Sequence, residues 1–152
     1  MSNDHWIAVV TEDNWAISVR ERLLGLGKDA ERRLARMAKG DHVWIYVNRK
    51  HVDRQVPRVY EIRAIARISG PIEHRRKSPW KPRGDQRFLV ARPIVIERTM
   101  AFPAIDILKR LSFAGPPRAW GVRLLNAPLR LTSADVAKLE VASKSATGKS
   151  ST

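Results

Sequence analysis

The chain has 152 residues, of which 43% are hydrophobic and none is cysteine. This length fits one globular domain and excludes a multidomain machine, while the lack of cysteine excludes disulfides, cysteine-ligated zinc and thiolate catalysis. Lysine and arginine number 29 against 15 aspartate and glutamate residues, which gives a formal charge of +14. Such a charge attracts polyanions at long range, so nucleic acid is the first partner to consider.

Membrane partners are the main alternative for a basic protein, but that mode of binding needs a hydrophobic anchor. No apolar run approaches the roughly 18 residues of a spanning helix, and residues 1–5 are polar. We therefore expect a cytoplasmic protein with no secretory signal and no membrane partner.

The first third of the chain predicts two strands separated by helix. The apolar run 6–10 predicts a buried strand that ends at a polar turn. Residues 15–22 and 29–37 predict a helix in two pieces, because two glycines interrupt the helical pattern at 23–27. Residues 42–47 predict a second strong strand.

The middle of the chain alternates apolar with basic residues. Segments 56–68 and 87–96 predict half-buried strands whose outer faces carry positive charge, including Arg63 and Arg92. The segment between them, 69–86, contains three prolines and a basic run and predicts an exposed loop.

The last third predicts a short helix over 103–111, a strand or hairpin over 120–131, and a helix capped by Thr132 or Ser133 that runs through Val141. Short strands with peripheral helices predict a small mixed β-barrel of the α+β class over residues 1–142. Residues 143–152 contain only small and polar types and lysine, and predict a disordered tail.

The sequence contains no strong pattern of catalytic or metal-binding residues. The four histidines show no metal-ligand spacing. Asp41 and Glu61 suggest a metal-dependent nuclease only weakly, because Arg63 stands where such a core would carry lysine. The segment 25–28 lacks the ending of a phosphate-binding loop. We expect no enzyme activity, no metal and no cofactor.

The basic loop is stronger evidence, with seven lysines and arginines against two acids between Glu73 and Arg92. Trp80 lies in the middle of it, where a large aromatic side chain can stack on a base while the basic side chains hold phosphates. The alternatives are a solvated charged face and a Trp80 that folds back onto the barrel. The candidate phosphate-binding residues are Arg75, Arg76, Lys77, Lys81 and Arg83.

The other tryptophans divide by their surroundings. Trp6, Trp44 and Trp120 lie in strand-like apolar runs, which favours a place in the core. Trp15 fits either the base of the first helix or the wall of a pocket.

An ordered set of sequence blocks resembles the EVE domain between about His5 and Glu140. The blocks include His5 to Thr11, Asp13 to Trp15, Met37 to Asp41, Trp80 to Pro82, Leu111 to Phe113 and Arg118 to Gly121. EVE domains belong to the PUA-like superfamily and are related to YTH domains. The resemblance implies a compact β-barrel flanked by helices that reads a modified base turned out of its strand.

The resemblance also implies the base pocket. Thr11 and Asn14 match polar readers of the base edge, and Trp80 matches an aromatic residue at the pocket border. Leu24 stands where many members carry an aromatic wall, which removes stacking of about 1–3 kcal/mol per base. The complete candidate pocket is Thr11, Asn14, Trp15, Leu24, Trp80 and Ser112.

Two functions of different classes follow. The first is a non-catalytic module that reads a modified base in DNA or RNA by base flipping. The alternative is a general RNA-binding protein of PUA-like type that acts in RNA modification or in ribosome and tRNA metabolism. A nucleotide-modifying enzyme would need an acid–base or metal set that the sequence does not display.

Overall fold

The computed structural model describes residues 3–27, 29–48, 60–80, 89–114, 123–124 and 126–150. No helix in this part of the chain is both long and apolar enough to cross a membrane. The elements are, in chain order, β1 (His5–Thr11), α1 (Glu12–Glu21), β2 (Leu23–Gly25), α2 (Ala30–Leu34), β3 (His42–Asn48), β4 (Tyr60–Ile68), β5 (Glu73–His74), β6 (Val90–Pro103), α3 (Ile105–Leu108), β7 (Leu129–Leu131) and α5 (Ser133–Ser150).

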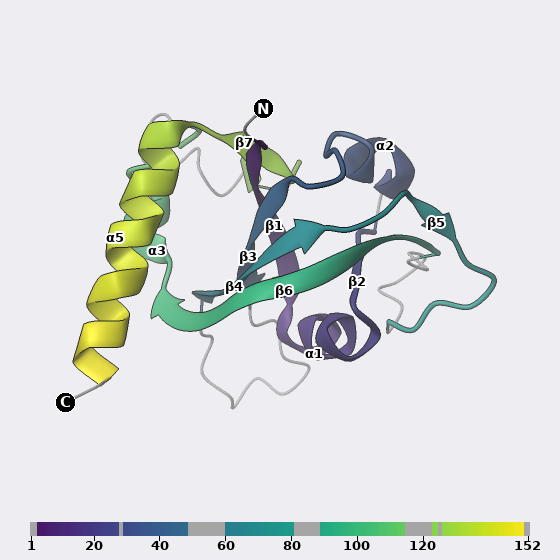
Figure 1. The fold of residues 1–152 in the computed structure, drawn as a ribbon, viewed down its shortest axis with the longest axis horizontal. Helices are drawn as coiled ribbons and strands as arrows, with labels where there is room; N and C mark the ends of the chain where they lie inside the picture. The colour runs from purple at the N-terminus through teal and green to yellow at the C-terminus, as the bar shows by residue number, and fades with distance from the viewer. Residues whose placement is uncertain are drawn as a thin grey trace.

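Seven strands form one curled sheet in the order β2-β6-β4-β3-β1-β7, with β5 also paired to β6 (Figure 1). Strands β1 and β3 are parallel, and the other pairs among the described strands are antiparallel. The helices lie at the periphery of this sheet. The predicted α+β class with a mixed, barrel-like sheet is confirmed.

Each face of the sheet has its own core, because successive side chains of a strand point to opposite faces. Trp6 and Val10 of β1 pack into the core that also contains residues of α1, α2 and β2. Ile7 of β1 and Trp44 of β3 pack into the other core, together with α3 and α5. The predicted core positions of Trp6 and Trp44 are confirmed, whereas Trp120 lies outside the described residues.

The first helix begins earlier than predicted, at Glu12, because the Thr11 side chain caps it and two acids occupy its first turn. It ends at Glu21, and the next residue, Arg22, adopts a left-handed conformation with φ of 56°. The predicted interruption of the helix at 23–27 is confirmed, but Leu23–Gly25 within it forms strand β2 and pairs with β6. The predicted second piece is shorter, because α2 covers only Ala30–Leu34.

Strand β6 is longer than predicted, and one of its arginines corrects the expected outward charge. Arg92 is 6% exposed and points inward. Its guanidinium donates to the carbonyls of Gly70 at 2.9 Å and Leu34 at 3.1 Å, and to that of Met37. Arg63 on β4 is half-buried and pairs with two carboxylates, so it adds little free charge.

The C-terminal elements agree in part with the sequence. Helix α3 lies within the predicted 103–111 helix. Among the described residues of the predicted 120–131 strand, Leu129–Leu131 is extended and residues 123–124 are helical. Helix α5 runs to Ser150 instead of ending near Val141, and Ser143 is buried where its hydroxyl accepts a hydrogen bond from Arg98 at 2.7 Å.

Candidate nucleic-acid interface

The end of β1 and the start of α1 place the two predicted polar readers together. The Thr11 Oγ1 accepts a hydrogen bond from the Asn14 backbone N–H at 3.3 Å, which satisfies one of the free N–H groups at the helix start. Both residues are half-buried. Thr11 therefore has a structural role as a helix cap, whether or not it also contacts a ligand.

Asn48 lies beside Thr11, and sequence reasoning missed it. The two residues are register partners at the carboxyl ends of the parallel strands β1 and β3. The Oδ1 atom of Asn48 is buried and has no hydrogen-bond partner in the described part of the chain. An unsatisfied buried acceptor costs about 1–3 kcal/mol, so a ligand donor here would be favourable. The only sequence signal is a polar residue directly after an apolar strand.

The two predicted pocket walls are core residues in this structure. Trp15 is 7% exposed and Leu24 is fully buried, and both belong to the core cluster beneath α1 and α2. Leu24 therefore packs against the protein's own side chains. It could contact a bound base only if a neighbouring side chain moved away.

Trp80 folds back onto the barrel, which is the alternative that the sequence left open. It is 4% exposed, and its indole Nε1–H donates to the Ser18 hydroxyl at 2.8 Å. The ring lies against Gly25, where an added Cβ would be 2.8 Å from the indole. Its backbone N–H donates to the Ser78 hydroxyl at 3.1 Å. Ser18 and Gly25 are thus among the residues that hold Trp80, and the sequence did not single out Ser18.

Ser112 lies apart from the other predicted pocket residues, on the side of the sheet covered by α3 and α5. Its backbone N–H and hydroxyl both donate to Asp135, at 2.8 Å and 2.5 Å, and Asp135 also caps α5 together with Thr132. Burial raises the pKa of Asp135, but the hydrogen bonds from Ser112 and Thr132 outweigh it and lower the pKa below 3.8. Ser112 therefore has a structural role here, away from the other candidate pocket residues.

The predicted phosphate-binding run follows β5. Arg75 is half-buried and its Nη1 pairs with Glu73 at 3.2 Å, while Arg76 and Lys77 are exposed. Lys81 and Arg83 lie outside the described residues.

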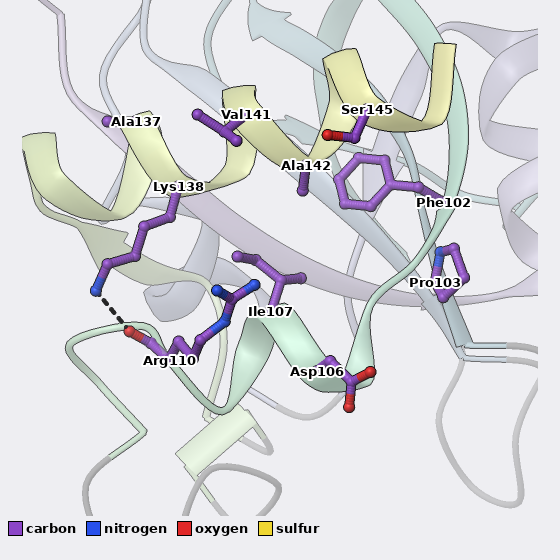
Figure 2. Close-up of a pocket in the computed structure, with 10 residues that line it drawn as sticks. All are labelled: Phe102, Pro103, Asp106, Ile107, Arg110, Ala137, Lys138, Val141, Ala142 and Ser145. Atoms are coloured by element: carbon purple, nitrogen blue, oxygen red, sulfur yellow. Dashed lines mark hydrogen bonds between the residues drawn. The ribbon is translucent and has the colours of Figure 1, made fainter. Parts of the chain in front are cut away.

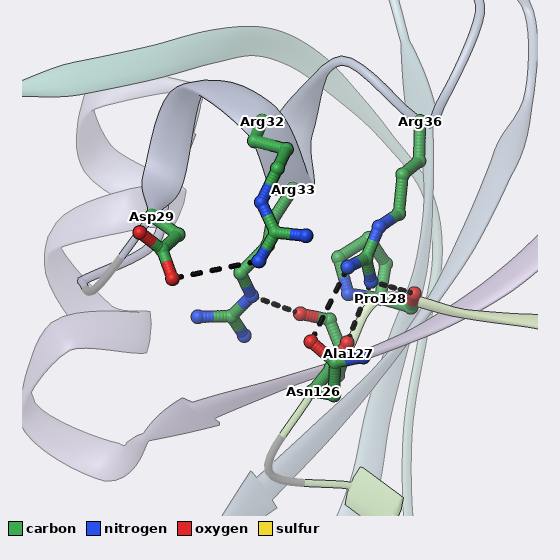
Figure 3. Close-up of polar contacts among 7 residues, drawn as sticks. All are labelled: Asp29, Arg32, Arg33, Arg36, Asn126, Ala127 and Pro128. Atoms are coloured by element: carbon green, nitrogen blue, oxygen red, sulfur yellow. Dashed lines mark hydrogen bonds and ion pairs between the residues drawn. The ribbon is translucent and has the colours of Figure 1, made fainter.

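A second basic group, which sequence reasoning missed, lies on α2 and the turn after it (Figure 3). The Arg33 Nε donates to the Ala127 carbonyl at 2.5 Å, and the Arg36 Nη1 donates to the Asn126 carbonyl at 2.6 Å. Arg32 pairs with Asp29 at 3.4 Å. The signal in the sequence is the cluster of three arginines, Arg32, Arg33 and Arg36, within five residues.

The predicted nuclease carboxylates have structural partners. Asp41 is 5% exposed and accepts hydrogen bonds from the Trp6 indole at 2.9 Å and the Ala38 N–H at 2.8 Å. Glu61 pairs with Arg63 at 2.9 Å. Within the described ranges, no three histidine or acidic side chains are grouped to hold a metal ion.

An open groove of about 570 Å³ lies on the opposite face, between the end of β6, α3 and α5 (Figure 2). Apolar side chains such as Phe102, Ile107 and Val141 line it, with Arg110 and Lys138 at its rim. None of the predicted pocket residues lines this groove.

Comparison with known proteins identifies the fold. No family model matches the chain, and no curated protein matches it. Among solved structures, the Mmi1 YTH domain is 12% identical, with a TM-score of 0.61, and the match covers 97% of this chain and 78% of that one.

Two further structures are similar to the chain. The YTH domain of Zygosaccharomyces rouxii MRB1, solved with N6-methyladenosine RNA, is 9% identical with a TM-score of 0.59, over 91% of this chain and 86% of that one. A protein from Pseudomonas syringae is 15% identical with a TM-score of 0.56, over 90% and 97%. The specific resemblance to EVE domains stays a prediction, and the chain shares its fold with YTH domains.

Proposed function

We propose that this protein is an RNA-binding module that reads a modified base and carries out no catalysis. The observation that carries the proposal is the position of Trp80, an aromatic side chain at the end of a basic segment and beside α1 and β2. The MRB1 YTH domain, which shares the fold, was solved with N6-methyladenosine RNA. An aromatic ring next to basic side chains supplies base stacking and phosphate contacts together.

The base enters, in this proposal, where the indole of Trp80 now packs on Gly25. Trp80 leaves its contact with Ser18 and stacks on the flipped base, while Leu23 and Ala91, which pack with Trp80, form the apolar floor. Unstacking a base costs a few kcal/mol, which ring stacking and hydrogen bonds to the base edge recover.

The polar groups for the base edge lie at the ends of β1 and β3. Asn14 offers an amide that both donates and accepts, and the buried Oδ1 of Asn48 offers an acceptor that lacks a partner among the described residues. Thr11 positions Asn14 through the helix cap. The exposed residues Arg76 and Lys77 would hold phosphates, with Arg75, Lys81 and Arg83 as further candidates.

General RNA binding without base selection is the second candidate. It is favoured by the burial of Trp15, Leu24 and Trp80, because a pocket filled by its own side chains admits no base. In that case the basic residues alone bind the phosphate backbone.

The deciding experiment measures binding of RNA oligonucleotides that differ at one base. A panel with N6-methyladenosine, 5-methylcytosine or unmodified bases is titrated by fluorescence anisotropy at low and physiological salt. A reader prefers one modified base at both salt concentrations, and Asn14→Ala reduces that preference. The control Asn3→Ala, an exposed asparagine before β1, keeps it.

Equal affinity for all members of the panel would favour general RNA binding. No binding to any RNA at low salt would overturn both candidates.

A further inference from the structure

We propose that the face made by Arg32, Arg33 and Arg36 is a second contact for RNA, one that binds backbone phosphates away from the base site. We call it the α2 arginine face. The inference rests on the proposed function, because it assumes that the polyanion is RNA. The α2 arginine face would extend the path of the RNA strand beyond the basic run that follows β5.

Backbone oxygens hold two of these guanidinium groups in place. Arg36 donates to the carbonyls of Asn126 at 2.6 Å and Pro128 at 3.2 Å, and to the Asn126 side-chain oxygen at 3.2 Å (Figure 3). Arg33 donates to the Ala127 carbonyl at 2.5 Å. A neutral carbonyl orients a guanidinium without cancelling its charge, so these two groups stay cationic and preorganised.

The charge on this face is concentrated. Burial and then the neighbouring Arg36 lower the pKa of Arg33, and Asp29 only partly opposes them. No carboxylate in the described part of the chain pairs with Arg36. Arg32 is 67% exposed, and its one ion pair among the described residues is with the half-exposed Asp29, a contact that exchanges readily for a phosphate. An incoming phosphate would relieve the repulsion among the three guanidinium groups.

The α2 arginine face connects to the basic run after β5. The His74 ring nitrogen contacts Glu31 at 2.9 Å, so the two segments touch through neighbours of Arg32 and Arg75. Arg92 fixes the end of α2 from below by binding the Leu34 and Met37 carbonyls. The two basic segments are thus adjacent and rigidly supported, as a continuous track along a strand requires.

The test compares Arg32→Gln with Lys109→Gln, each of which removes one exposed positive charge. Lys109 follows α3 on the other face of the sheet, so it controls for net charge. Affinities for RNAs of about five and about twelve nucleotides are measured across a salt series. For the long RNA, Arg32→Gln should reduce the slope of log affinity against log salt by about 0.7 and weaken binding about fourfold at physiological salt.

Three further results are expected. The short RNA should bind Arg32→Gln as tightly as the unchanged protein, because it reaches only the base site. Lys109→Gln should match the unchanged protein on both RNAs. Arg32→Lys should restore most of the slope, because the slope counts charges.

The inference is overturned if Arg32→Gln keeps full affinity for the long RNA, if both RNAs weaken equally, or if Lys109→Gln weakens binding as much. It is also overturned if Arg32 matters only for binding to vesicles that contain phosphatidylserine. Failure of the unchanged protein to bind either RNA would instead refute the proposed function. A protein that prefers a modified base and is insensitive to Arg32 would refute only the α2 arginine face.

Discussion

Replacing Gly25 with alanine tests how closely the Trp80 indole packs on β2. The added methyl would lie 2.8 Å from two ring carbons, a separation that neither backbone nor ring tolerates without shifting. Overpacking of this kind typically costs about 1–3 kcal/mol. Gly25 does not have a positive φ, so its backbone conformation is compatible with alanine.

The loss of folding stability caused by Gly25→Ala should therefore depend on whether Trp80 is present. In a Trp80→Ala background the clash disappears, and Gly25→Ala should be neutral or stabilising by about 0.4–1 kcal/mol. The coupling between the two changes should then be about 1–4 kcal/mol. Urea unfolding of the four proteins in the cycle measures it directly.

Gly70→Ala is the matched control, because its added Cβ would lie 3.0 Å from the Pro93 ring and does not contact Trp80. Its effect on stability should be the same with or without Trp80. An equal cost of Gly25→Ala in both backgrounds would refute the packing described for the indole.

Three further predictions concern stability. Burial, followed by the charge of His42, lowers the pKa of His5 below 6.5, so stability should fall as the pH drops below 6.5, and His5→Gln should remove this trend in urea midpoints between about pH 5 and 8. Asp135→Asn should cost about 1–3 kcal/mol and abolish the loss of stability that occurs as the pH falls below 3.8. Leu24→Trp should cost about 1–3 kcal/mol in thermal unfolding, because Leu24 has no free space around it, and an unchanged melting temperature would mean that the site is open.

Local pattern was enough to predict the elements whose stability is local. Continuous apolar runs identify β1 and β3, and the predicted cap at Thr132 identifies the start of α5. Strand β2 was missed because Leu23–Gly25 becomes a strand only by pairing with β6, some seventy residues later. The length of α5 was missed because a polar tail composition gives no indication that Arg98 and Glu140 hold its middle turns.

The sequence predicted which residues lie near the candidate site, but it did not predict most of the contacts that they make. Thr11 and Asn14 do meet at the start of α1. The inward turn of Arg92 was unpredictable, because its carbonyl partners come from Leu34, Met37 and Gly70. Buried guanidinium groups need several acceptors at once, and only the folded chain brings such acceptors together.

The hydrogen bond between Trp80 and Ser18 gives a last prediction about the base site. If the indole must leave Ser18 before a base can stack, the measured affinity equals the intrinsic affinity multiplied by the fraction of open molecules. Ser18→Ala removes the 2.8 Å hydrogen bond and should destabilise the closed form by about 1 kcal/mol, which raises the apparent affinity for RNA about fivefold. The same change should lower the urea midpoint, so binding and stability move in opposite directions. The exposed Ser133→Ala at the start of α5 serves as the control and should change neither. A Ser18→Ala protein that is less stable and binds RNA no more tightly would show that Trp80 does not occupy the place of the base.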